Sequence, residues 1–201
     1  SEAKYLKAKG FGALAIYDDD VLLDKQRDRE IFKGLKDLGM PYRCMTRTNL
    51  ADEKDLQLLK DTGCAEVCIG VETADNEIKK VIRKGTTIEQ DTLFMKRAKE
   101  IGLRVKTYLM IGLPGESKES VKKTKKWLAE VNPDNYDVSI FTPYPGSEIY
   151  RNKGNYDINW DGDYLKTIWY SGQAQYESCA VSTSHLPSNE VLLLKRELEV
   201  G

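Results

Sequence analysis

The chain has 201 residues, with 31 Lys and Arg against 32 Asp and Glu, and its formal net charge is −1. This balance gives no electrostatic basis for binding nucleic acid or an anionic membrane surface. The sequence contains no run of 18 apolar residues, so no membrane-spanning helix is predicted. The first seven residues are charged and lack the apolar core of a signal peptide. We therefore expect a cytoplasmic protein of one domain, or one domain with an appendage, without a nucleic-acid or membrane partner.

Apolar runs alternate with helical patterns along most of the chain. The pattern predicts strands at 13–17, 42–46, 66–71, 105–111 and 136–141. It predicts helices at 2–9, 25–38, 51–61 (capped by Asn49), 76–81, from Thr86 or Thr87 to Glu100, and at 117–131. After Tyr150 the periodicity fades to weak strand character at 175–183 and a final helix at 189–199, capped by Ser188.

Each predicted strand is followed by a helix or a turn, which is typical of βα units in an α/β fold with parallel strands. The units fit either a barrel or an open parallel sheet. The sequence contains neither Gly-x-Gly-x-x-Gly nor Gly-x-x-x-x-Gly-Lys-[Ser/Thr], so neither a dinucleotide fingerprint nor a P-loop is predicted.

The segment 105–117 carries the strongest signal, because an apolar run stops at a glycine turn and leads directly into a helix start. Gly112, Pro114 and Gly115 form this turn, and a second run ends similarly at Pro145-Gly146. Ligands of parallel sheets and barrels lie at the carboxyl ends of the strands. Glycine at such an end lets a ligand approach the backbone closely.

The period-2 pattern of the strands separates an apolar face from a polar one. At 66–72, Val67, Ile69 and Val71 share a face, and Glu72 closes the polar face. We interpret Glu72 as a candidate ligand-binding carboxylate; the alternative is a solvated strand end or a partner of Lys or Arg. A second polar face, which indicates a functional interior, contains Arg104, Lys106, Tyr108, Met110 and Gly112.

Two further charged positions lie at strand ends. The run Asp18-Asp19-Asp20 could hold Mg²⁺ or recognise an amine, and it is equally typical of a solvated turn. Arg47, at the end of the 42–46 strand, could pair with a carboxylate in a bidentate manner or form a surface salt bridge.

The four cysteines, Cys44, Cys64, Cys68 and Cys179, do not indicate a disulfide scaffold, and they favour a reducing cytoplasm. Cys64 and Cys68 would lie roughly 13 Å apart along one strand, too far for a disulfide or a single metal ion, so buried thiols are expected. The single histidine, His185, argues against a zinc site and against a Ser/His/Asp triad, and we expect it at the surface.

Six segments together resemble the core of the radical S-adenosylmethionine (SAM) superfamily. The resemblance is closest to the subgroup often fused to a cobalamin-binding domain, which includes anaerobic Mg-protoporphyrin ester cyclase-like proteins and radical methyltransferases. Order and spacing agree over residues 11–150, through the segments Ile16–Asp20, Thr62–Thr73, Ile82–Thr87, Ala98–Leu103, Met110–Glu116 and Pro143–Ser147.

The resemblance implies a partial (βα) barrel over residues 1–150, with five of an expected six strands, and a C-terminal extension over 151–201. SAM would lie across the strand ends. Asp18 and Asp19 would lie near its methionine amine and Glu72 near its ribose or amino-acid part. Arg47 and Lys106 would face the SAM carboxylate or the substrate. The residues expected to flank the adenine are Met110, Gly112, Thr142 and Tyr144.

One departure from the family is large, because its hallmark Cys-x-x-x-Cys-x-x-Cys motif is absent. In the family three thiolates of this motif hold a [4Fe–4S] cluster. We therefore expect a fragment, inactive alone, of a parent enzyme that has the motif upstream of residue 1. That parent would receive an electron from a donor and cleave SAM to a 5′-deoxyadenosyl radical. It would then act on a small-molecule substrate, or it would transfer methyl groups with cobalamin bound by an upstream domain.

Two other readings stay open. The chain could be a cluster-free binding or scaffold module, or an ordinary barrel enzyme in which Glu72 and Lys106 perform acid–base chemistry. Aromatic residues of the extension would shape substrate contacts or simply pack: Trp160, Tyr164, Trp169, Tyr170 and Tyr176. A barrel without its first strand has an exposed edge, which predicts self-association.

Overall fold

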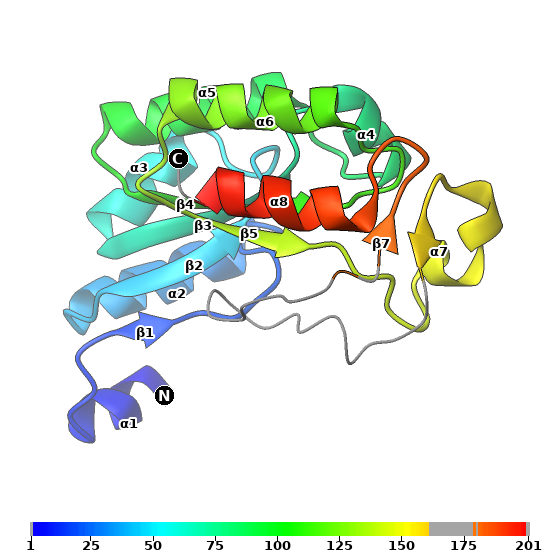
Figure 1. Cartoon of the computed structure of the whole chain (residues 1–201). Coiled ribbons are helices and arrows are strands. Elements are labelled where there is room, and N and C mark those ends of the chain that lie inside the picture. Colours follow the sequence, from blue (N-terminus) through cyan, green and yellow to red (C-terminus); the bar gives the residue numbers. More distant parts are fainter. Residues whose placement is uncertain (1, 161–178, 180, 200–201) are drawn as a thin grey trace. The chain divides into compact units, whose positions relative to one another are not determined.

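A computed structural model of the chain describes residues 2–160, 179 and 181–199. Strands and helices alternate from the N-terminus (Figure 1), in the order α1 (Glu2–Ala8), β1 (Leu14–Ala15), α2 (Lys25–Asp37), β2 (Tyr42–Thr46), α3 (Glu53–Asp61), β3 (Cys64–Glu72), α4 (Asn76–Val81), α5 (Ile88–Glu100), β4 (Val105–Ile111), α6 (Lys118–Val131) and β5 (Asn135–Ile140). The extension adds α7 (Glu148–Arg151), the 3₁₀ turn η1 (Lys153–Asn155), β6 (Asn159–Trp160), β7 (Val181–Ser182) and α8 (Ser188–Glu199).

The five strands of the main sheet are parallel and follow the order β1-β2-β3-β4-β5. Leu14 lies opposite Tyr42, and Cys44 opposite Val67. This sequential order is that of a (βα) barrel, whereas a doubly wound sheet places its first strand in the middle. The predicted α/β fold with a partial barrel of five parallel strands is therefore confirmed.

The chain divides into two compact units. The first contains Ser1–Gly70, Glu89–Thr107 and Pro133–Asn135, and the second contains Val71–Ile88, Tyr108–Asn132 and Tyr136–Gly201. In the first unit the rings of Phe32 and Tyr42 stack at a centroid distance of 5.3 Å, and both side chains are 1% exposed. Burial of such side chains supplies most of the stability of a unit of this kind.

Helix α3 begins two residues later than predicted, and its cap is Asp52 rather than Asn49. The Asp52 carboxylate accepts the backbone N–H of Asp55 at 2.9 Å, and the Asp55 carboxylate accepts the N–H of Asp52 at 3.2 Å. This reciprocal capping box satisfies two amide groups that have no partner within the helix. Asp55 is fully buried and also binds Lys25 and Arg29 of α2, which ties the two helices together.

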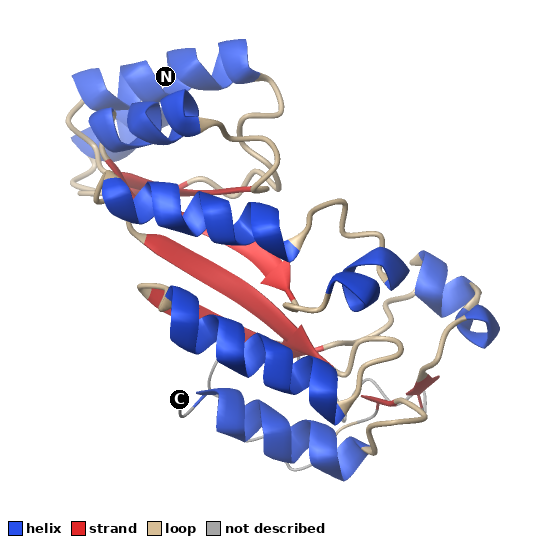
Figure 2. Ribbon diagram, turned by 90° about the horizontal axis from the view of Figure 1, so that it is seen from above, coloured by secondary structure: helices blue, strands red, loops and turns tan. Residues whose placement is uncertain are grey.

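In the second unit, α6 is capped by Ser117, the residue at which the predicted helix begins, and the Ser117 hydroxyl accepts the N–H of Ser120 at 3.3 Å. The apolar face of α6 includes Val121 and Trp127, and α8 contributes Val191, all of them buried. The two helices lie side by side in Figure 2, and side chains of both line one groove. No helix within the described ranges is long and apolar enough to cross a membrane.

Several boundaries differ from the sequence prediction. Strand β3 starts at Cys64, two residues early, and β1 contains two residues where five were predicted. Periodicity did not reveal the short elements α7, η1 and β6 of the extension. Of the predicted strand at 175–183, residues 181–182 form β7, and most of the remainder lies outside the described residues, as do Tyr164, Trp169, Tyr170 and Tyr176.

Candidate functional site

Glu72 ends β3 in an unusual backbone conformation. Its φ is +65°, and the N–H of Thr73 donates to the carbonyl of Val71 at 2.8 Å across it, which forms a three-residue turn. Such turns with positive φ are rare and strained for residues other than glycine. Their occurrence at the end of a parallel strand is a sign of function.

The Glu72 carboxylate has one satisfied and one unsatisfied oxygen. Lys84 Nζ lies 2.9 Å from Oε1, and the two side chains are 17% and 14% exposed. Oε2 is buried and has no hydrogen-bond partner within the described part of the protein. The pairing with Lys84 confirms the interpretation of Glu72 as a partner of a lysine, and its role as a ligand-binding carboxylate stays a prediction.

The loop after β4 is organised around Glu116. Its carboxylate oxygen Oε2 accepts the N–H of Gly112 at 2.5 Å and that of Leu113 at 3.3 Å. Gly112 has a φ of +81°, which favours glycine. Burial of Glu116, only 1% exposed, raises its pKa to about 8 despite the two backbone hydrogen bonds.

Residues next to the antiparallel strands β6 and β7 of the C-terminal extension hold this loop in place. Thr183 Oγ1 donates to the carbonyl of Glu116 at 2.6 Å, and Gly115 N–H donates to the carbonyl of Asp157 at 2.9 Å. The Asp157 carboxylate in turn accepts the N–H and hydroxyl of Ser184 at 2.8 and 2.9 Å. No sequence pattern indicated this anchoring, because residues 157 and 183 lie far from 116 in the chain and belong to no periodic segment.

The other predicted adenine-flanking residues lie in the same unit. Met110 is half-buried on β4, in the strict alternation of buried and half-buried positions that the sequence predicted. After β5 the chain stays close to β4, since Phe141 N–H donates to the carbonyl of Ile111 at 2.8 Å. Thr142 is buried, and Tyr144 is 48% exposed with a pKa raised by partial burial.

The remaining predicted residues, Asp18, Asp19, Arg47 and Lys106, belong to the first unit. Arg47 Nε lies 2.9 Å from Asp20 Oδ2, so the third aspartate of the run, rather than the first two, holds this guanidinium. Asp18 lies 3.3 Å from Arg27, and Asp19 is exposed. Lys106 is half-buried on β4. Their predicted roles toward SAM stay predictions.

The thiols of the first unit form a pair that the sequence did not reveal. Cys44 and Cys64 are buried with their Sγ atoms 3.9 Å apart, and Cys68 is buried on the same strand as Cys64. Hydrogen bonding with Cys64, followed by burial, raises the pKa of Cys44 well above its usual range. Within the described ranges no three His, Cys, Asp or Glu side chains are arranged to hold a metal ion, so these thiols do not fit a [4Fe–4S] cluster.

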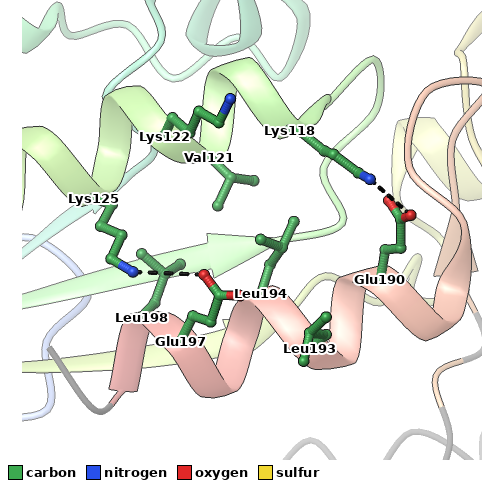
Figure 3. Close-up of a pocket in the computed structure, with 9 residues that line it drawn as sticks. All are labelled: Lys118, Val121, Lys122, Lys125, Glu190, Leu193, Leu194, Glu197 and Leu198. Atoms are coloured by element: carbon green, nitrogen blue, oxygen red, sulfur yellow. Dashed lines mark ion pairs between the residues drawn. The ribbon is translucent and has the colours of Figure 1, made fainter.

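A groove between α6 and α8 shares no residue with the predicted cofactor site. Its volume is about 300 Å³, and its apolar lining includes Val121 and Leu194. Figure 3 shows ion pairs bridging it near both ends, Lys118–Glu190 at 2.8 Å and Lys125–Glu197 at 3.5 Å. The two ion pairs connect the helices across the groove.

Comparison with known proteins identifies the family. The profile of the Radical SAM superfamily matches residues 1–128. The chain therefore belongs to the Radical SAM superfamily, and the resemblance seen in its motifs is confirmed.

Two relatives match most of the chain. An uncharacterized methyltransferase of Pyrococcus horikoshii is 32% identical over 144 residues, which cover 71% of this chain and 31% of the relative. The anaerobic magnesium-protoporphyrin IX monomethyl ester cyclase of Rubrivivax gelatinosus is 28% identical over 154 residues, covering 75% of this chain and 28% of the cyclase. The chain thus spans about a third or less of the length of these curated relatives.

Solved structures share the fold. The coproporphyrinogen III oxidase HemN of Escherichia coli, a radical SAM enzyme, superimposes with a TM-score of 0.62 at 19% identity, covering 89% of this chain and 36% of HemN. The radical SAM methyltransferase TsrM of Kitasatospora setae has a TM-score of 0.62 at 19% identity over 69% of this chain and 29% of TsrM. At this identity the similarity concerns the fold alone.

Proposed function

We propose that this chain is the SAM-binding part of a radical SAM enzyme. The observation that carries the proposal is the buried, partnerless Oε2 of Glu72 at the carboxyl end of β3. A buried carboxylate oxygen without a donor is unfavourable, and a ligand hydroxyl or ammonium group would satisfy it. SAM carries both kinds of donor.

Within the second unit, the residues proposed to hold SAM are Glu72, Met110, Gly112, Thr142 and Tyr144. Glu72 would accept a hydrogen bond, and Gly112 would flank the adenine through its backbone, because Val181 occupies the space on its side-chain side. Asp18 and Asp19 are proposed for the methionine amine and Arg47 and Lys106 for the carboxylate or substrate. These assignments rest on position in the family motif.

The [4Fe–4S] cluster that the family implies does not fit the thiols of the described residues. We propose that its cysteine ligands belong to the remainder of a longer protein, in agreement with the small share of its relatives that the chain spans. The cluster would supply the electron for reductive cleavage of SAM. Methyl transfer with cobalamin is the finer proposal, supported by the methyltransferase among the relatives.

A second candidate is a cluster-free SAM-binding module. The observation that favours it is the buried position of three of the four thiols and the absence, within the described ranges, of any three-ligand metal group. This candidate predicts SAM binding without iron.

One experiment separates the two. The product of the whole gene and the 201-residue chain are reconstituted anaerobically with iron and sulfide. Iron content, visible absorbance, the dissociation constant for SAM and 5′-deoxyadenosine release from SAM under reductant are then measured. We expect about four irons per chain and SAM cleavage in the gene product alone, as a cysteine-ligated cluster requires. SAM binding by both proteins with no iron in either would favour the module, and no SAM binding by either would overturn both.

A further inference from the structure

The turn at Glu72 is held by a buried lysine. Lys79 of α4 is 2% exposed, and its Nζ donates to the carbonyl of Val71 at 2.7 Å. The same carbonyl accepts the N–H of Thr73 at 2.8 Å, so both lone-pair directions of one oxygen are used. Burying an ammonium group is costly unless it is hydrogen-bonded, and the bond from Lys79 to the Val71 carbonyl supports the strained backbone of Glu72.

A second lysine fixes the Glu72 side chain. Lys84 lies 2.9 Å from Oε1, in a pair that is mostly shielded from water. A charge-assisted hydrogen bond in such surroundings is stronger and more directional than one at the surface. It restricts rotation of the carboxylate, so that the orientation of Oε2 is set as well.

The two lysines are themselves connected. The backbone N–H of Lys84 donates to the carbonyl of Lys79 at 2.9 Å, and Arg83 between them has a φ of +53°. The end of α4 therefore turns tightly enough to direct both ammonium groups toward the last two residues of β3. The neighbouring Lys80 behaves differently, since it is exposed and binds only Glu77, one turn away on its own helix, within the interactions described.

We propose that Lys79 and Lys84 are positioning residues that act together as a clamp on Glu72. Lys79 stabilises the turn that places the residue, and Lys84 occupies Oε1 and leaves Oε2 oriented for a hydrogen-bond donor of SAM. The inference rests on the proposed SAM binding and adds two residues that do not touch SAM. The donor is a ribose hydroxyl or the α-ammonium group, and the two can be distinguished.

The test measures dissociation constants for SAM and for 5′-methylthioadenosine, which keeps the ribose and lacks the amino-acid part. The protein is the product of the whole gene, with the 201-residue chain measured in parallel. The variants are K84M, K84R, E72Q and the double variant K84M/E72Q, with K80M as the matched lysine control. K79M is included with its circular dichroism spectrum, because a buried lysine variant can fail to fold.

We expect K84M to weaken SAM binding about tenfold or more, as loss of one hydrogen bond to a charged group does. K84R should retain most of the affinity and K80M all of it. In the E72Q background, K84M should cause no further loss, which a general effect on stability would not produce. An equal loss for methylthioadenosine assigns the donor to the ribose, and a loss confined to SAM assigns it to the ammonium group.

Three results would overturn the inference. If wild type binds SAM and K84M binds it as well as K80M does, the clamp has no role and the proposed function stands. If the losses of SAM affinity in K84M and E72Q add in the double variant, Lys84 does not act through Glu72. If wild type binds neither ligand, both the proposed SAM site and the proposed clamp are wrong.

Discussion

A methyl group of Val181 lies 2.9 Å from the position that a Cβ atom would occupy on Gly112. Real Cβ atoms do not approach other atoms this closely. Strand β7 of the C-terminal extension therefore packs directly on the backbone of the loop proposed to flank the adenine. Two constraints act on Gly112 at once, its φ of +81° and the contact with Val181.

The first prediction follows from these two constraints. G112A should lower the free energy of unfolding by about 2–4 kcal/mol, from left-handed strain and overpacking together. Urea denaturation measures this. The matched control is G146A, which has a φ of +89° and nothing within 4 Å of its added Cβ, so it should lose about 1 kcal/mol from strain alone.

The contact itself is isolated by a double-mutant cycle. In a V181A background the added methyl at position 112 has room, so G112A should cost roughly 1 kcal/mol less than in wild type. Equal costs in both backgrounds, or equal costs for G112A and G146A in wild type, would show that Val181 does not constrain the loop.

The sequence located the strands whose ends are proposed to bind the cofactor, but not the contacts that organise those ends. Periodicity and glycine turns were sufficient to predict β4, its alternating faces and the loop at Gly112. They could not predict that Thr183, 67 residues away, would bind Glu116, or that Lys84 would pair with Glu72. Both contacts join residues that are distant in the chain, and the segments that carry them have no periodic pattern. Their positions are therefore determined only by the tertiary structure.

The register between β2 and β3 is a second feature that could not be predicted from the sequence. The strand pattern started β3 at Glu66, and the expected distance related Cys64 only to Cys68. In the structure β3 starts at Cys64, opposite Tyr42, and the register shifts between Tyr42 and Arg43. This irregularity brings Cys64 toward Cys44. A local irregularity of one residue has no signature in hydrophobic patterning, so the thiol pair could not be predicted.

The second prediction concerns Glu116 and pH. Burial raises its pKa from 4.5 to about 8, so the protonated form is favoured in the folded state. Its contribution to stability is full below about pH 4.5 and is lost as the pH rises through 8. Stability should therefore fall by about 2 kcal/mol between pH 6 and 9, at no more than roughly 1.4 kcal/mol per pH unit for one proton.

Urea unfolding at several pH values tests this. E116Q keeps an oxygen that can accept from Gly112 and removes the titration, so its stability should vary less over the same range. E119Q, an exposed position on α6, should follow wild type. A wild-type profile that stays flat from pH 6 to 9 would contradict the prediction.

The third prediction concerns Asp55. Burial alone would raise its pKa, but hydrogen bonds from Lys25 at 2.6 Å and Arg29 at 2.9 Å outweigh burial and lower the pKa. The resulting stabilisation is present at neutral pH and is lost as the pH falls below the ordinary value of 3.8.

D55N should therefore destabilise the protein by about 2–4 kcal/mol at pH 7, because it leaves two cations without their carboxylate and weakens the capping box. Its effect should shrink on acidification. D61N, at the exposed end of the same helix, should change stability by less than about 0.5 kcal/mol. A D55N loss that is the same at pH 7 and pH 3 would rule out the ion pairs as its cause.

The fourth prediction concerns the thiols. Cys179 is the half-buried one among the four, and Cys44, Cys64 and Cys68 are buried. Thiolate is the reactive form, and the raised pKa of Cys44 disfavours it further. In native protein one thiol per chain should react readily with a disulfide reagent, and the other three should react only when urea unfolds the chain.

C179S should remove the rapid phase of this reaction, whereas C68S should leave the rapid phase unchanged. Rapid reaction of a second thiol in native C179S would show that the pair at Cys44 and Cys64 opens without unfolding.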